Sequence, residues 1–217
     1  MRIKRPIRTD DILIDWRSVG SFMTNSFLLA CPKTKEGAII DASAEPSVLL
    51  DMIKKHDIKL KYILQTHAHL DHVGAIHELK KQTGAEILIH KEELYLYDTV
   101  AEQCAMFGLK PLPTPPAPDK MLTEGEEIIL GDLKISVMET PGHTLGGLCF
   151  YLDSGYIFTG DTLFAGSIGR TDLPGGNYKT LMKSLKRLAS LPEKTFVFSG
   201  HGEISTIGNE KIYNPYL

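Results

Sequence analysis

The 217 residues are 42% hydrophobic and 24% charged, which is an ordinary composition for a globular chain long enough to bury a substantial core. No segment approaches the roughly 20 consecutive apolar residues that a membrane-spanning helix needs. The basic first residues are followed by acidic ones rather than by the apolar stretch of an export signal, and the net charge of −3 gives no overall attraction for nucleic acid, so we expect a cytoplasmic protein with neither membrane nor nucleic-acid partners.

The first half of the chain predicts alternating strands and helices. Strands are predicted where short apolar runs fall between turn residues, in residues 25–30, 37–41, 61–66 and 85–90. Helices are predicted where apolar residues recur at helical spacing, in residues 45–56, 75–84 and 91–107. Pro46 suits the first turn of one helix, and Gly84 suits the end of another.

A proline-rich segment, residues 111–118, divides the chain near its middle. We interpret it as the connection between two strand-rich halves of a single domain spanning residues 1–217. Strands are predicted in the second half at residues 126–130, 133–140, 147–152, 156–161 and 195–200. Residues 178–190 predict the clearest amphipathic helix of the chain. Two strand-rich halves with flanking helices suggest an α/β fold in which two sheets pack face to face between helical layers.

Four polar clusters directly follow four of these predicted strands. They are the segment THAHLDH (residues 66–72), TPGHT with His143, TGDT with Asp161, and SGHG with His201. Loops at strand ends are where a rigid scaffold presents chemistry, and the flanking glycines allow sharp turns. We therefore expect the four clusters to converge at one edge of the sheets.

The clusters supply donors of the types that bind metals. They contain five imidazoles and two carboxylates: His67, His69, His72, His143, His201, Asp71 and Asp161. Such donors suit zinc, iron or manganese. Seven ligands exceed the needs of one ion but fit two, provided that Asp161 bridges them. His67 and His69 are two residues apart and can face one ion, while Asp71 and His72 turn toward the other.

The other histidines and the cysteines are expected to be structural. The histidines on predicted helices or at a strand end are typical of satisfied core or surface groups: His56, His77 and His90. The cysteines are widely spaced and odd in number, so we expect inert, half-buried thiols: Cys31, Cys104 and Cys149. Asp41 ends an early strand and is either an acceptor for the N–H of a metal-binding histidine or a simple strand-end cap.

The segment THAHLDH resembles the H-x-H-x-D-H signature of the metallo-β-lactamase superfamily, and PGHT, GDTLF and GHG follow in that family's order and spacing. Nearly the whole chain is similar to the type II glyoxalase branch (hydroxyacylglutathione hydrolases) and its shorter bacterial relatives. The resemblance implies a four-layer αββα sandwich with the site along one edge of the sheets. It also implies a first metal on His67, His69 and His143, a second on Asp71, His72 and His201, and Asp161 as the bridge.

The resemblance further implies hydrolysis of a small-molecule thioester, S-lactoylglutathione or a related acyl-glutathione, by two divalent metal ions, with zinc favoured and iron or manganese as alternatives. Two cations that share a water lower its pKa from 15.7 to near 7, which supplies a bridging hydroxide as the nucleophile. A thiolate with a pKa near 8.5 leaves without a strong general acid. Asp71, which can orient the hydroxide, and the bridging Asp161 are the expected catalytic residues.

Two departures from the glyoxalase pattern concern the binding of glutathione. Only residues 202–217 follow His201, so we expect the helical C-terminal extension of the full-length enzymes to be missing. GSIGRTDLPGG (residues 166–176) stands in place of a Gly-Lys-Phe-Tyr type stretch, with Arg170 at the lysine position. We expect Arg170 to bind the substrate, and a pair with Asp172 that only shapes the loop is the alternative.

Other functions remain open at this point. The G-R-T-D form is shared with persulfide dioxygenases, which implies a single iron on His67, His143 and Asp161 as the main alternative. Another hydrolase of the superfamily with a different substrate is a further one. A non-catalytic binding protein is disfavoured because all seven ligands are present. The sequence does not determine the oligomeric state.

Overall fold

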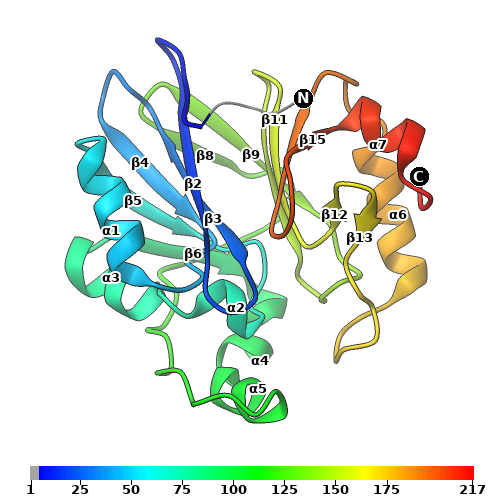
Figure 1. Ribbon diagram of the computed structural model, residues 1–217, viewed down its shortest axis with the longest axis horizontal. Coiled ribbons are helices and arrows are strands. Elements are labelled where there is room, and N and C mark those ends of the chain that lie inside the picture. Colours follow the sequence, from blue (N-terminus) through cyan, green and yellow to red (C-terminus); the bar gives the residue numbers. More distant parts are fainter. Residues whose placement is uncertain (1–4) are drawn as a thin grey trace.

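Two β-sheets packed face to face form the centre of the computed structural model, which describes residues 5–217 (Figure 1). The first sheet is seven-stranded, antiparallel from β1 to β4 and parallel from β4 to β7. Its strands, in spatial and chain order, are β1 (Ile7–Arg8), β2 (Leu13–Val19), β3 (Thr24–Ala30), β4 (Glu36–Ile40), β5 (Lys59–Leu64), β6 (Glu86–His90) and β7 (Lys120–Leu122).

The second sheet is six-stranded, in the order β15-β14-β11-β10-β9-β8, and only its β11–β14 pair is parallel. Its strands are β8 (Glu127–Leu130), β9 (Leu133–Glu139), β10 (Leu148–Leu152), β11 (Tyr156–Gly160), β14 (Phe196–Ser199) and β15 (Ser205–Thr206). A separate hairpin consists of β12 (Leu163–Phe164) and β13 (Ser167–Ile168). Residues 123–126 connect the last strand of the first sheet, β7, to the first strand of the second sheet, β8. The proline-rich segment 111–118 precedes β7, so it lies within the first half and does not connect the two halves.

Helices lie on the outer sides of both sheets (Figure 1). Helices α1 (Pro46–Lys55) and α3 (Ile76–Thr83) cover the first sheet, and α6 (Tyr178–Leu188) and α7 (Ile207–Tyr213) cover the second. At one end of the sandwich lie α2 (Leu70–Val73), a short 3-10 helix (Lys91–Glu93), α4 (Leu94–Tyr97) and α5 (Val100–Met106). Within residues 5–217, no helix is both long and apolar enough to cross a membrane.

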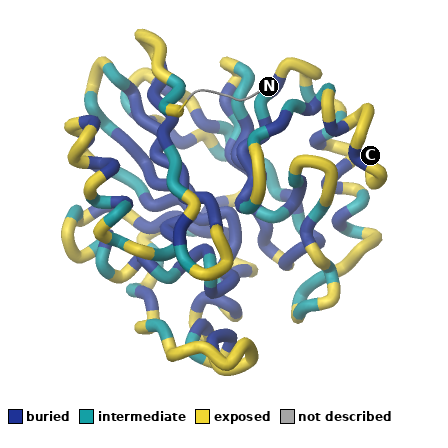
Figure 2. The backbone as a smooth tube through the Cα atoms, viewed as in Figure 1, coloured by how far each residue is buried: buried dark blue, intermediate teal, exposed yellow. Residues whose placement is uncertain are grey.

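Alternating apolar side chains create three buried layers between these elements. Phe27 and Leu29 of β3 face the space between the sheets, whereas Leu28 of the same strand faces the helices outside. In the second sheet Phe158 faces inward, and Ile157 packs against α6 and α7. Figure 2 shows the buried segments concentrated in the strands, with the exposed ones on loops and outer helix faces. The predicted four-layer αββα sandwich is confirmed.

Most predicted elements are present, with ends shifted by one or two residues, but the helix predicted over residues 91–107 is divided into the 3-10 helix, α4 and α5. The longest elements that were not predicted are β2 and α7, and the short elements β1, β7, β12, β13, β15 and α2 were not predicted either. The apolar alternation of β2 is interrupted by Asp15 and Arg17. Asp15 is nevertheless buried, and its carboxylate accepts from Arg17 at 2.9 Å and contacts His56 Nε2 at 2.8 Å. These partners satisfy a charge that would otherwise be too costly to bury in a strand.

Candidate metal centre

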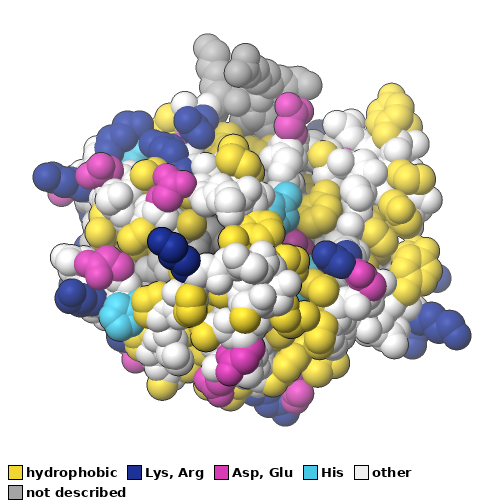
Figure 3. All heavy atoms as spheres, turned by 60° about the horizontal axis from the view of Figure 1, so that its bottom comes forward, with side chains coloured by type: hydrophobic (Ala, Val, Ile, Leu, Met, Phe, Trp, Pro, Cys, Tyr) yellow, Lys and Arg dark blue, Asp and Glu magenta, His cyan; other side chains and the backbone are white. Residues whose placement is uncertain are grey.

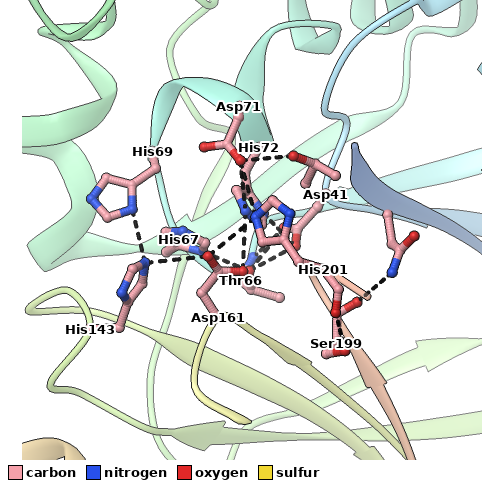
Figure 4. A network of polar contacts seen from close by, with 12 residues as sticks. Asp41, Thr66, His67, His69, Asp71, His72, His143, Asp161, Ser199 and His201 are labelled. Carbon is pink, nitrogen blue, oxygen red and sulfur yellow. Dashed lines mark hydrogen bonds and ion pairs between the residues drawn. The ribbon is translucent and has the colours of Figure 1, made fainter. Parts of the chain in front are cut away.

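The structure brings all seven predicted ligands together at one edge of the sandwich (Figure 4). They come from the ends of four strands, as the sequence predicts. His67 and His69 follow β5 and lead into α2, which carries Asp71 and His72; the remaining ligands follow β9, β11 and β14 and are His143, Asp161 and His201. Gly200 is needed for this convergence, because a Cβ at that position would overlap Asp161 Oδ1.

The seven ligands form three overlapping groups of three, and Asp161 belongs to the middle one. The groups His67–His69–His143, His67–His72–Asp161 and Asp71–His72–His201 each offer ligand atoms within 4.8 Å of one another. Asp161 Oδ2 lies 3.6 Å from His143 Nε2 and 3.4 Å from His201 Nε2, while its Oδ1 lies 3.4 Å from His72 Nε2. This carboxylate therefore stands between the two outer groups, as a bridging ligand must.

Several of these donor atoms are buried without a hydrogen-bond partner among the described residues. They are the Nε2 atoms of His67, His69 and His72 and Oδ1 of Asp161. Leaving a polar atom buried and unpaired costs about 1–3 kcal/mol, so natural proteins rarely do it without a functional reason. His69 presents Nδ1 to the cluster, 2.9 Å from His143 Nε2, so its Nε2 points away. Divalent cations would satisfy the other unpaired atoms, which converge on the centre. The donor set therefore fits two divalent metal ions.

Contacts behind three of the histidines turn their Nε2 atoms toward the centre. His72 Nδ1 donates to Asp41 Oδ2 at 3.0 Å, and His143 Nδ1 donates to the carbonyl oxygen of Arg170 at 2.7 Å. His67 Nδ1 contacts the Thr66 hydroxyl at 3.0 Å, which itself donates to Asp41 at 2.8 Å. Such contacts fix both the tautomer and the orientation of a ligand. Asp41 is therefore an acceptor for a metal-site histidine and more than a strand-end cap.

Two buried residues that were not predicted hold the loop between His67 and His72. Both carboxylate oxygens of Glu93 accept main-chain hydrogen bonds at 2.8 Å, from Ala68 and from Gly146. Gln103 of α5 accepts from the Leu70 amide at 3.0 Å and donates to the Ala68 carbonyl at 3.0 Å. In the sequence, Glu93 and Gln103 are simply polar residues of a predicted helix. The spacing of residues does not show whether such a side chain is buried or exposed.

The two halves of the cluster have opposite electrostatics. Burial lowers the pKa of His69 to about 3, with neighbouring imidazoles adding to the effect. Burial also opposes charge on His72 and His201, but the carboxylates of Asp71 and Asp161 outweigh it. They raise the pKa of His72 well above its ordinary value and that of His201 to about 9. Without a cation, the histidines beside the carboxylates therefore hold protons that a metal ion would displace.

A cavity of about 500 Å³ opens over the cluster. His69, Asp71, His143, Asp161 and His201 lie on one side of it, and mostly apolar side chains form the rest. Figure 3 shows hydrophobic side chains gathered around histidines on this face of the molecule.

Arg170 lines the same cavity, but its guanidinium group forms two hydrogen bonds with Asp172, at 2.7 and 2.6 Å. Both side chains are exposed. The structure therefore contains the Arg170–Asp172 pair that we considered as the alternative to substrate binding. Binding of the substrate by Arg170 stays a prediction.

The remaining histidines and the cysteines lie outside the cluster. His56 contacts Asp15, His90 Nε2 contacts Glu139 at 3.1 Å, and His77 is exposed on α3. The cysteines form no disulfide and are fully buried rather than half-buried: Cys31, Cys104 and Cys149. Burial raises the pKa of Cys149 to about 12, which keeps that thiol protonated and unreactive.

The model of the family described as the metallo-beta-lactamase superfamily matches residues 19–201. The chain belongs to the metallo-beta-lactamase superfamily. Its fold and donor set are those of a metallohydrolase of this superfamily. The matched region contains all seven predicted ligands, from His67 to His201.

Relatives within the metallo-beta-lactamase superfamily cover most of the chain. A protein of Haemophilus influenzae named hydroxyacylglutathione hydrolase GloC is 41% identical over 187 residues, which are 84% of this chain and 88% of the relative. The crystal structure of the BLEG-1 B3 metallo-beta-lactamase has a TM-score of 0.87 and 34% identity, and covers 94% of this chain and 99% of its own. The crystal structure of TTHA1623 in a di-iron-bound form has a TM-score of 0.85 and 38% identity, and covers 92% of this chain and 98% of its own.

Proposed function

We propose that the protein hydrolyses thioesters, with acyl-glutathiones such as S-lactoylglutathione as its substrates. The observation that carries the proposal is the arrangement of two outer ligand groups on either side of Asp161, at one side of a single cavity. The likeness to a relative named hydroxyacylglutathione hydrolase supports the choice of a glutathione thioester. Zinc is the metal we favour, while the di-iron form of a related structure makes iron a serious alternative.

In this reaction water adds to the acyl carbon, a C–O bond forms and the C–S bond breaks. Two divalent cations, when bound, would acidify the water and polarise the carbonyl. One cation would be held by His67, His69 and His143. The other would be held by Asp71, His72 and His201, and Asp161 would contact both cations. Asp71 Oδ2 accepts from the Thr24 hydroxyl at 2.8 Å, which fixes the carboxylate that we propose to orient the attacking water.

The leaving group is a thiolate, whose thiol has a pKa near 8.5. The thiolate accepts a proton either from the solvent or from the attacking water. No strong general acid is therefore required. An alkoxide leaving group is far more basic, so we expect simple oxygen esters to react more slowly than thioesters.

The proposal is tested with protein reconstituted separately with zinc, iron and manganese. We expect release of a thiol from S-lactoylglutathione with at least one metal, and little oxygen uptake with glutathione persulfide. Oxygen uptake with a single bound iron, and no thiol release, would instead support the dioxygenase on His67, His143 and Asp161. We disfavour it because it gives Asp71, His72 and His201 no role, although they lie together.

A further inference from the structure

We infer that the cavity over the metal centre binds an apolar acyl group, so that the preferred substrates are thioesters of hydrophobic acids. The inference rests on the proposed thioester hydrolysis and names the part of the substrate that the cavity selects. The apolar wall, as we call it, consists of Phe22, Leu96, Met106, Phe107, Phe164 and Leu173.

The apolar wall and the metal cluster belong to one cavity. The same space of about 500 Å³ is bounded by the wall residues and by His69, Asp71, His143, Asp161 and His201. A carbonyl group placed at the cluster therefore has its substituents within reach of the wall. This volume is in the range of pockets that bind small organic molecules.

Large hydrophobic side chains on this wall are exposed to solvent. The exposed fractions of the residues are 38% for Phe22, 67% for Met106 and 45% for Phe107. Phe22, in the turn between β2 and β3, packs edge-on against Phe107 at the end of α5, with ring centroids 5.9 Å apart. Exposed apolar side chains that gather beside a site mark a binding surface, because each loses unfavourable contact with water when a ligand covers it.

Three polar side chains around the wall direct their hydrogen-bond donors to main-chain groups of the protein. The Tyr95 hydroxyl donates to the Pro174 carbonyl at 2.8 Å, and the Thr99 hydroxyl donates to the Tyr95 carbonyl at 2.6 Å. Gln103 uses both its oxygen and its nitrogen on main-chain groups. A hydrogen-bond acceptor of a ligand would thus lose its hydration here without gaining a donor from these side chains, which is unfavourable.

The charges of the cavity also disfavour a charged group. In the described part of the chain, Arg170 is the one lysine or arginine among the lining residues, and it is paired with Asp172. Glu102 adds a negative charge. The glutathione part of a thioester carries two carboxylates, so it belongs at the rim near Arg170 rather than against the wall. The acyl group is then the part that enters the cavity.

The test is a series of glutathione thioesters with acetyl, lactoyl, butanoyl, hexanoyl and octanoyl groups. We expect kcat/KM to rise up to roughly fourfold for each methylene that contacts the wall. The corresponding thioesters of N-acetylcysteamine, a thiol without carboxylates, should show the same dependence on chain length. Equal kcat/KM values for acetyl, lactoyl and octanoyl substrates would overturn the inference and leave the thioester hydrolysis intact.

Variants connect the preference to the wall. Phe107→Ala and Met106→Ala should each reduce the octanoyl-to-acetyl ratio of kcat/KM, by about tenfold for the aromatic residue. Ile129→Ala is the matched control, because Ile129 is 46% exposed on β8 and does not line this cavity, and it should leave the ratio unchanged. An unchanged ratio in both wall variants, with native circular dichroism, would contradict the inference.

Binding of the thioether S-octylglutathione separates this inference from the proposed function. If no thioester is cleaved but S-octylglutathione binds at least about tenfold more tightly than S-methylglutathione, and Phe107→Ala abolishes the difference, the apolar site stands and the reaction assignment fails. Sedimentation of the wild type and the variants tests whether a second copy of the chain, rather than an acyl group, covers the apolar wall. A dimer that Phe107→Ala dissociates and Ile129→Ala does not would assign the wall to a second copy and overturn the inference.

Discussion

His72 and Asp41, which are 31 residues apart in the chain, are joined by a 3.0 Å hydrogen bond from Nδ1 to Oδ2. The same carboxylate accepts from the main chain and the hydroxyl of Thr66, the residue before His67. Asp41 is 1% exposed. One buried aspartate thus supports histidines of both proposed metal groups without itself facing the cations.

Replacement of this support is expected to weaken metal binding. Asp41→Ala should lower the affinity for zinc by about 10–100-fold, because His72 loses the partner that fixes its tautomer and orientation. Competition with a chromophoric chelator measures the change. Asp51→Ala on α1, where the side chain is exposed, is the control and should bind zinc as the wild type does. Unchanged affinity in Asp41→Ala would show that the hydrogen bond has no role in metal binding.

The position of Asp161 between the two ligand groups predicts different metal contents for two variants. The wild-type protein should contain about two metal ions per chain. Asp161→Ala removes the shared ligand, so both ions should be lost or weakly held, and activity should fall to background. His201→Ala removes a ligand from one group and should retain about one ion. Elemental analysis after gel filtration checks this, and one tightly held ion in the wild type would refute the dinuclear site.

The ion pair of Arg170 and Asp172 can be disrupted by replacing either residue, and we expect the two replacements to change KM in opposite directions. If the guanidinium binds a substrate carboxylate, Arg170→Ala should raise KM for a glutathione thioester by roughly one to two orders of magnitude. Asp172→Asn should lower KM, because it releases the guanidinium. The carbonyl of Arg170 that accepts from His143 is a main-chain group, so metal content should stay constant. Equal KM values in the wild type and both variants would assign the pair to loop structure alone.

Metal binding at the group containing Asp71, His72 and His201 is expected to depend on pH. The pKa of His201, raised to about 9 by the neighbouring carboxylates against the effect of burial, means that a proton must leave before Nε2 can bind a cation. Apparent affinity should therefore rise with pH toward about 9, with proton release on binding. In the metal-free protein the same raised pKa stabilises the fold fully below about 6.5 and loses that contribution as pH rises through about 9.

Zinc titrations in weak buffer, followed with a pH indicator, measure the released protons, and chemical denaturation of the metal-free protein measures the second effect. His201→Ala should release fewer protons than the wild type. Affinity that is constant between about pH 6 and pH 9 would contradict the assignment of these protons to the site.

The sequence determined those features of the protein that depend on local pattern. Apolar runs predicted most strands and helices, because burial on one or both faces of an element imposes a period on its own residues. His67, His69, Asp71 and His72 were recognisable as ligand candidates because they stand within six residues of one another, after a strand. Glycine-flanked polar residues at other strand ends predicted the rest of the cluster.

Only the tertiary structure decided which distant residues meet. Strand β2 was not predicted because Asp15 interrupts its apolar pattern. The burial of Asp15 depends on its contacts with Arg17 and with His56, which lies at the end of α1. The supports of the ligand loop, Glu93 and Gln103, cannot be distinguished by spacing from exposed polar residues. The apolar wall combines Phe22 with side chains from more than seventy positions later in the chain, such as Met106, and has no sequence period of its own. Periodicity reports burial within one element, whereas a binding surface depends on contacts between elements that the fold alone brings together.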